Sequence, residues 1–135
     1  MTPTELLGFA QQLLRGLGDS TSGNASRLAA VVARQAVEVL IEQRCVAVGA
    51  SCDRATMRSK LAILRALDDP QRADQLASLW HQLSDCCHQH AYELSPTVVE
   101  VRALCEGAAA VAHAMARFHQ EYARRTVDRR MLGAD

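Results

Sequence analysis

The chain has 135 residues, with 15 basic and 15 acidic side chains and a formal net charge of zero. Apolar residues make up 49% of it and aromatic residues only 4%, which favours closely packed helices over a β-sheet. The balanced charge excludes a strong overall attraction to nucleic acid or to an anionic membrane. No apolar run approaches the roughly 20 residues that a membrane span needs, so we expect one domain with a modest core and no membrane contact.

The cysteine content predicts a reducing compartment. There are five cysteines, an odd number, and three of them lie within helical patterns. No basic start followed by an apolar run, as in a secretory signal, precedes them. We therefore expect a cytoplasmic protein.

The first predicted helix covers about residues 3–17, with Thr2 as its cap and Pro3 in its first turn. Its inward stripe is expected to be Leu6, Phe9, Leu13 and Leu17. The segment at the end of this helix, residues 16–24, has turn-forming residues. It lacks the Gly-Lys-Ser/Thr ending of a phosphate-binding loop, so we interpret it as a connector.

The second predicted helix, about residues 25–48, should be the central helix of the core. Its inward positions are expected to be Leu28, Val32, Ala36, Val39 and Leu40. A polar stripe lies on another side and is interpreted as a solvated face: Arg27, Arg34, Glu38 and Glu42. The Arg34/Glu38 pair has the i,i+4 spacing at which exposed pairs contribute only a few tenths of a kcal/mol.

The third predicted helix follows a break at residues 49–52 and should be capped by Asp53. From Arg54 to Arg65 the segment has four basic residues and no acidic one: Arg54, Arg58, Lys60 and Arg65. This local imbalance makes the four residues a candidate phosphate-binding patch. A short exposed helix rich in arginine is the alternative.

The fourth predicted helix begins at Asp68-Asp69-Pro70, an acidic cap followed by a first-turn proline. Its inward stripe is expected to be Ala73, Leu76, Trp80, Leu83 and Cys87. The opposite side is then formed by Asp74, Ser78, His81, Asp85 and His88. Histidines, thiols and a carboxylate are concentrated where this helix should end.

The fifth predicted helix starts after Ser95-Pro96, with Thr97 and Glu100 as a capping box. Its inward stripe is expected to be Val98, Val101, Cys105, Ala108, Val111 or Ala112, Met115 and Phe118, continuing to Tyr122. We expect a single helical domain over residues 1–123. The basic tail, residues 124–135, is expected to be disordered.

A helix with Trp80 and Leu83 is followed by a histidine just past its end, an aromatic residue two positions later and then a capped long helix. This arrangement, which covers most of the chain, resembles the HEPN family (higher eukaryotes and prokaryotes nucleotide-binding). In that family a helix carries an arginine, four to six residues intervene, and a histidine follows at the helix end, often with a tyrosine shortly after. Trp80, Leu83, His90 and Tyr92 lie where this pattern places them. The arginine position falls on Asp85 or its neighbours, none of which is cationic.

The resemblance implies an up-and-down bundle of about five helices that forms a homodimer around a shared cleft. Active members are metal-independent ribonucleases, often of toxin-antitoxin or antiphage systems. Their histidine moves a proton, and their arginine stabilises the charge that builds on phosphate. The candidate catalytic residues here are His90, His88 and Asp85.

A carboxylate at the arginine position would repel the phosphate, unless Arg34, Arg44 or Arg102 supplies the missing charge. The resemblance therefore implies a catalytically degenerate binding or dimerisation module in a prokaryotic defence pathway. Its partners would be RNA, contacted by Arg102 and Tyr92, or a protein from the same operon. An active endoribonuclease using His90 and a structural partner-binding protein are the alternatives.

A metal site is a competing interpretation of the same segment. His81, Asp85 and His88 share a helical face, and their ligand types suit zinc. Adjacent Cys86 and Cys87, however, point about 100° apart on a helix, and no second pair has the usual ligand spacing. We expect no metal and no cofactor.

Overall fold

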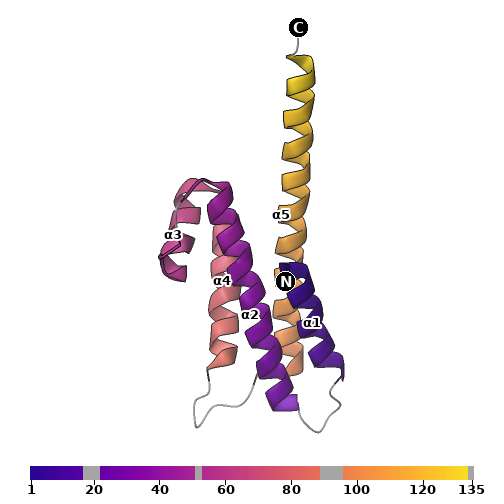
Figure 1. Ribbon diagram of the computed structural model, residues 1–135. Coiled ribbons are helices and arrows are strands. Elements are labelled where there is room, and N and C mark those ends of the chain that lie inside the picture. Colours follow the sequence, from indigo (N-terminus) through magenta and orange to yellow (C-terminus); the bar gives the residue numbers. More distant parts are fainter. Residues whose placement is uncertain (17–21, 51–52, 89–95, 134–135) are drawn as a thin grey trace.

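The computed structural model describes residues 1–16, 22–50, 53–88 and 96–133, apart from the side chains of residues 22, 23 and 119. Within these ranges the chain forms helices and no strand, which confirms the all-α class. The helices are α1 (Pro3–Gly16), α2 (Ser22–Ala47), α3 (Met57–Leu67), α4 (Pro70–Cys87) and α5 (Val98–Leu132). They form an up-and-down bundle in which α2 and α5 run in one direction and α1 and α4 in the other (Figure 1).

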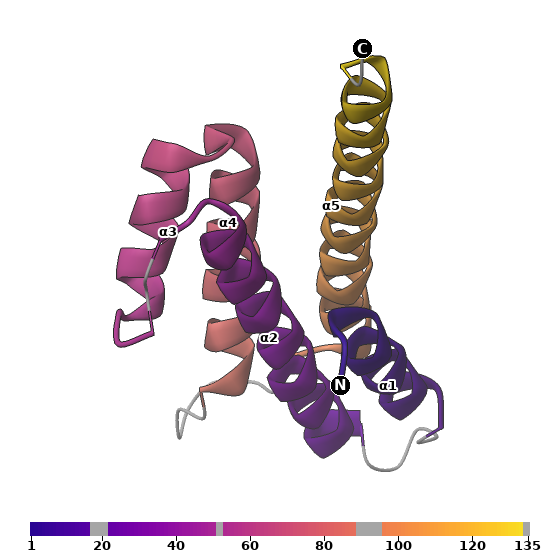
Figure 2. The same cartoon turned by 45° about the horizontal axis from the view of Figure 1, so that its top comes forward.

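Helix α2 is the centre of this bundle, as the sequence predicts, because it contacts each of the other four helices. Figure 2 shows it between α1 and α5 on one side and α3 and α4 on the other. Small side chains permit this close approach on several sides. The fully buried alanines of α2 are Ala29, Ala30, Ala33 and Ala36.

The buried face of α2 differs in part from the predicted stripe. Val32, Ala36 and Leu40 are buried as expected, but Leu28 is exposed and Val39 is only partly covered. Because several helices contact α2, its buried surface is wider than one stripe and includes Val37, Ile41 and Cys45. The helix ends at Ala47, and Gly49, which follows it, has a φ of 77° in the left-handed region that glycine readily adopts.

Helix α1 is rotated relative to its predicted orientation. Leu7, Ala10 and Leu14 are buried, whereas Phe9 is 45% exposed and Leu6 and Leu13 are only partly covered. The rotation follows from the position of α1 between α2 and α5, both of which it contacts. Leu17 lies outside the described residues.

The helix starts follow the capping signals in the sequence with one exception. The Asp69 carboxylate accepts a hydrogen bond from Gln71 N (3.0 Å) ahead of α4, and Thr97 Oγ1 accepts one from Glu100 N (3.1 Å) ahead of α5. For α3 the predicted cap, Asp53, is wrong. Thr56 is the cap instead, with its Oγ1 accepting from Ser59 N at 3.1 Å.

Helices α4 and α5 pack closely through a glycine in the middle of α5. A Cβ on Gly107 would lie 3.2 Å from Leu79 Cδ2. Leu79 is buried there although it is outside the predicted stripe of α4. A glycine inside a helix costs stability relative to alanine, and here its lack of a side chain makes room for Leu79.

An ion pair joins α2 to the turn between α3 and α4. Arg44 donates to the Asp68 carboxylate through Nε (2.6 Å) and an Nη (2.8 Å), and the two side chains are only 15% and 11% exposed. Arg44 also lies over the Phe118 ring, 5.9 Å from its centre, and Arg72 of α4 lies 5.7 Å from the same centre. These contacts connect α2, α4 and α5 at the place where α5 leaves the bundle.

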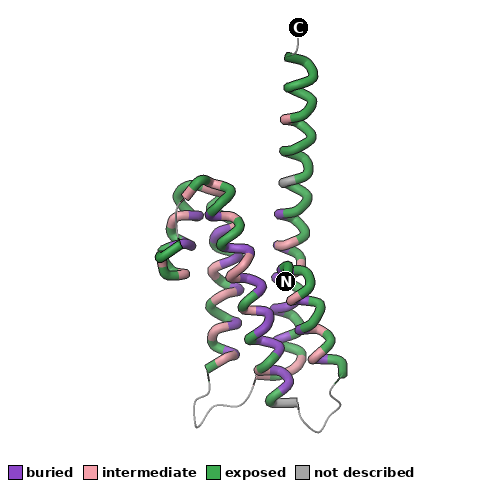
Figure 3. Tube along the Cα trace, viewed as in Figure 1, coloured by how far each residue is buried: buried purple, intermediate pink, exposed green. Residues whose placement is uncertain are grey.

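The C-terminal part of α5 continues without other helices beside it (Figure 1). The expected disorder after residue 123 is not what the structure has, because the helix runs on to Leu132. Nearly all of this part is exposed (Figure 3). Its arginines and Ala123 are good helix formers, and an i,i+4 ion pair joins Glu121 to Arg125. In the described part of the chain, every helix is too short or too polar to cross a bilayer.

The Arg44–Asp68 pair predicts a pH-dependent stability. The arginine, through its hydrogen bonds, holds the pKa of Asp68 below its ordinary value, so the pair stabilises the fold above the ordinary carboxyl pKa and loses its effect as the pH falls through the lowered one. Asp68→Asn should therefore cost about 2 kcal/mol near neutral pH, and this difference from the wild type should shrink in acid. Urea unfolding of both proteins, near neutral pH and in acid, measures this difference in the free energy of unfolding.

The matched control is Asp74→Asn. Asp74 pairs with Arg65 at 2.6 Å, but both side chains are more than half exposed, so its loss should cost less than about 0.5 kcal/mol. Equal effects of the two substitutions would contradict the role given to Asp68.

Candidate functional site

The end of α4 presents the polar face that the sequence predicts. His81, Asp85 and His88 are all exposed, and the backbone N–H of His88 closes the helix by donating to the carbonyls of Ser84 and Asp85. His90 and Tyr92, the other residues of the HEPN-like pattern, lie outside the described residues. The described part of this junction therefore offers a carboxylate and two imidazoles at the surface.

The inward position predicted for Cys87 is only partly correct. Cys86 faces the core and is buried, whereas Cys87 is only partly covered. Burial, together with the negative charge of Glu100, raises the pKa of Cys86 to about 11. Burial also raises the pKa of Cys87, against the opposing charges of Arg34 and Arg27. Within the described ranges, His, Cys, Asp and Glu side chains form no group of three with the geometry to hold a metal ion.

Two residues of the predicted solvated stripe of α2, Arg34 and Glu38, are instead part of the contact with α4. One oxygen of Glu38 accepts hydrogen bonds from Arg34 Nε (3.2 Å) and from Trp80 Nε1 (3.1 Å). The Arg34 guanidinium lies 5.6 Å from the centre of the Trp80 ring, a cation–π distance. Each side chain is partly covered by the others, so this polar cluster fixes how α2 and α4 pack.

Two of the arginines that could supply the missing motif charge already have partners. Arg34 belongs to the cluster with Glu38 and Trp80, and Arg44 is bound to Asp68. Arg102 is exposed and lines a small cleft of about 130 Å³ between α1 and α5, with Glu106 beside it. Two of the three candidate arginines are thus already paired with a carboxylate.

The four basic residues of the α3 region do not form one patch. Lys60 is only 6% exposed, and its Nζ donates to Glu42 of α2 at 3.0 Å. Arg65 pairs with Asp74 of α4. Arg54 and Arg58 are exposed, and among the described residues neither has an acidic partner within ion-pair distance.

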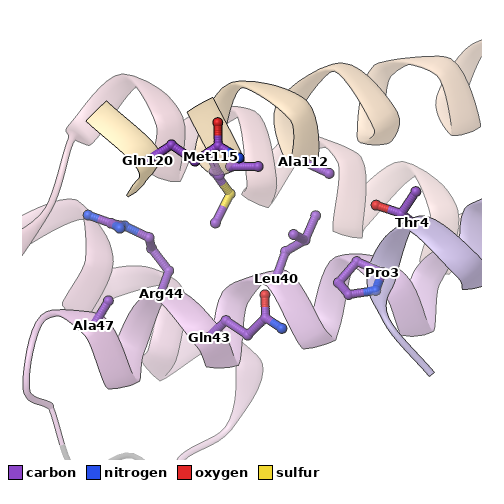
Figure 4. A pocket seen from close by; sticks show the side chains of 10 residues that line it. Pro3, Thr4, Leu40, Gln43, Arg44, Ala47, Ala112, Met115 and Gln120 are labelled. Atoms are coloured by element: carbon purple, nitrogen blue, oxygen red, sulfur yellow. The ribbon is translucent and has the colours of Figure 1, made fainter. Parts of the chain in front are cut away.

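A cleft lies at the foot of the exposed part of α5. The cleft has a volume of about 450 Å³ and lies between α5 and the pair α1 and α2 (Figure 4). Met115 of α5 and Leu40 of α2 face each other across it. Its lining residues are Pro3, Thr4, Leu40, Gln43, Arg44, Ala47, Ala112, Met115, Ala116 and Gln120.

The projecting part of α5, residues 117–132, exposes large apolar side chains next to this cleft. Phe118 is 50% exposed, Val127 53% and Met131 78%; Tyr122 and Leu132 are also exposed. The same segment has five arginines against two acidic residues. The sequence pattern predicted part of this surface, because the apolar stripe of α5 was expected to continue to Tyr122. It did not predict that this end of the stripe lies beyond the other helices and is exposed.

Comparisons with protein-family models, with curated proteins and with solved structures found no significant match to this chain.

The cluster around Glu38 predicts a stability loss with a spectroscopic signature. Glu38→Ala removes the acceptor of both Arg34 and Trp80 and should cost about 2 kcal/mol. Trp80 is the single tryptophan, so its emission should shift to longer wavelength as water replaces the carboxylate. Urea unfolding followed by fluorescence gives both quantities. Glu121→Ala, which removes an exposed pair on α5, is the control and should change stability by less than about 0.5 kcal/mol.

The buried thiols predict slow alkylation. Burial raises the pKa of both Cys86 and Cys105 to about 11, so that only about one in a thousand of each is a thiolate at pH 8. Peptide mapping after iodoacetamide treatment should find both at least about 100-fold slower than in concentrated urea. Comparable rates in the folded and unfolded protein would show that these thiols are not enclosed.

Proposed function

We propose that this protein is a helical interaction module without catalytic activity, which binds its partner through the projecting part of α5. One observation carries the proposal: residues 117–132 extend as a helix of roughly 24 Å with large apolar side chains exposed along it. A helix of this length without packing is marginal in water. Contact with another chain would cover these side chains and stabilise the segment.

The surroundings of Asp85 support the non-catalytic part of the proposal. Cleavage of RNA by a histidine needs a cation to balance the charge on phosphate. Asp85 presents the opposite charge at the surface, while Arg34 and Arg44 are bound to acidic residues elsewhere. We further propose that the module is a catalytically degenerate HEPN-like domain, because this would also explain the spacing of Trp80, His90 and Tyr92. A role in a prokaryotic defence or toxin-antitoxin system belongs to the proposal on that resemblance alone.

An RNA cleavage assay in EDTA tests this function. The wild type and His90→Ala should leave structured RNA equally intact. Cleavage by the wild type that is lost in His90→Ala would overturn the proposal in favour of an endoribonuclease. Asp85→Arg restores the cation at the motif position, and cleavage gained by this variant, and lost again when His90→Ala is added, would support a degenerate HEPN site.

A further inference from the structure

Helix α3 lies at the edge of the bundle. Among the described residues it contacts α2 and α4 but neither α1 nor α5, and Figures 1 and 2 show it outside the other four helices. Only three of its eleven residues are buried, Lys60, Leu61 and Leu64. An isolated helix of this length is marginal in water, so α3 depends for its stability on a small contact surface.

Charged groups form a large part of this contact. Three ion pairs connect α3 and its C-cap to the neighbouring helices: Lys60–Glu42, Arg65–Asp74 and Asp68–Arg44. The other ion pairs of the described residues both join positions four apart on a single helix. Within the described ranges, every ion pair between two different elements therefore holds α3 in place.

The middle of the α3 contact is a buried charge. Lys60 is only 6% exposed, whereas the side chain of its partner Glu42 is 55% exposed. Burying an ion pair has a desolvation cost that the attraction often fails to recover, so an apolar side chain in place of Lys60 would hold α3 as well or better. Loss of the carboxylate alone would leave a buried ammonium without a counter-charge, which is far more costly.

The start of α3 leaves a gap against α2. A cleft of about 200 Å³ lies between the two helices and is lined by Glu42, Cys45, Val46, Ala50, Asp53 and Lys60. Cys45 is 2% exposed, and its Sγ donates to the carbonyl oxygen of Lys60 at 4.0 Å. Movement of α3 away from α2 would therefore bring the Cys45 thiol into contact with water.

We infer that α3 is a hinged cover, which detaches from α2 while the other four helices stay folded. Elements with few buried apolar contacts open at a lower free energy than the whole domain unfolds. The opening exposes the thiol of Cys45 and the amine of Lys60, the single lysine of the chain. A partner that binds the uncovered side of α2 would shift the equilibrium toward the open form. The inference does not depend on the proposed function, because α3 and α5 are not in contact in the described structure.

The end of α3 next to α4 is the fixed point of this movement. Asp68 caps α3, and the side chains of Arg44 and Asp68 are only 15% and 11% exposed. The Arg65–Asp74 pair is more than half exposed, and such pairs contribute little to stability. The ion pair of Lys60 is therefore the contact that controls the opening.

Hydrogen exchange of the full chain, followed amide by amide, tests whether α3 opens alone. The amides of residues 60–67 should exchange at least about 100-fold faster than those of residues 36–41 in α2, and low concentrations of urea should change their rates little. Labelling of Cys45 by a thiol reagent, followed by mass spectrometry, provides a second measurement. The open population that it gives should equal the one from the α3 amides.

The two residues of the central ion pair should have opposite effects. Glu42→Gln leaves the Lys60 ammonium without its counter-charge and should raise the labelling rate of Cys45 at least about 10-fold. Lys60→Met removes the charge and keeps an apolar side chain, so that Cys45 should be labelled no faster than in the wild type. Glu121→Gln is the matched control: it makes the same change at an exposed pair of α5 and should leave the labelling rate unchanged.

Two results would overturn the inference. Exchange of the α3 amides only together with those of α2 would show that α3 unfolds as part of the whole domain. Faster labelling of Cys45 in Lys60→Met than in the wild type would show that the buried lysine holds α3 in place, and that its charge is not the weak point of the contact.

Discussion

The burial of α2 against all four other helices is the constraint on which the rest of the structure depends. A helix surrounded in this way needs small side chains wherever a neighbour approaches, and the alanines between Ala29 and Ala36 meet this need. Small apolar contacts alone specify the orientation of helices weakly. Polar contacts define the orientation more closely. Near the middle of α2, Glu38 accepts hydrogen bonds from Arg34 and from Trp80 of α4, and near the end of α2, Arg44 is paired with Asp68. These two contacts hold α2 and α4 together at two points along their length. Neither helix can slide by one turn along the other without separating a hydrogen-bonded charge from its partner, which is costly where the groups are partly buried.

The sequence was sufficient for the number of helices, their order and most of their boundaries. Asp69-Pro70 and Thr97 act locally, through hydrogen bonds to the next turn, and so their effect can be predicted without the tertiary structure. The orientation of a helix is harder to predict when it has more than one neighbour. Phe9 and Leu28 belong to apolar stripes yet are exposed, because the contacts of α1 and α2 are centred beside those stripes. Asp53 had the right chemistry for a cap, but Thr56 stands where the helix begins.

The candidate site was predictable only as a set of residues. Their helical phase correctly placed His81, Asp85 and His88 on an outer face. It also predicted Cys87 as the inward thiol, whereas its neighbour Cys86 is the more deeply buried of the two. The charge count could not reveal that Lys60 and Arg65 have acidic partners on other helices, since such pairs join residues far apart in sequence. The exposed part of α5 was missed because a basic segment with few apolar residues resembles a disordered tail in composition. Its helical continuation depends on α5 already being formed and extended from the bundle, since propagation of a helix costs far less than its nucleation.

Phe118 has a consequence for motion. Helix α5 is continuous from Val98 to Leu132, so its buried first part and its exposed last part move as one rod. Phe118, between Arg44 and Arg72, lies near the point about which this rod would pivot. Over roughly 24 Å of projecting helix, a tilt of about 10° displaces the end by about 4 Å. A small shift of α5 in the core, around Cys105 or Ala108, would thus produce a larger displacement of its far end. Conversely, a force from a partner bound at that end would act on the packing of the core.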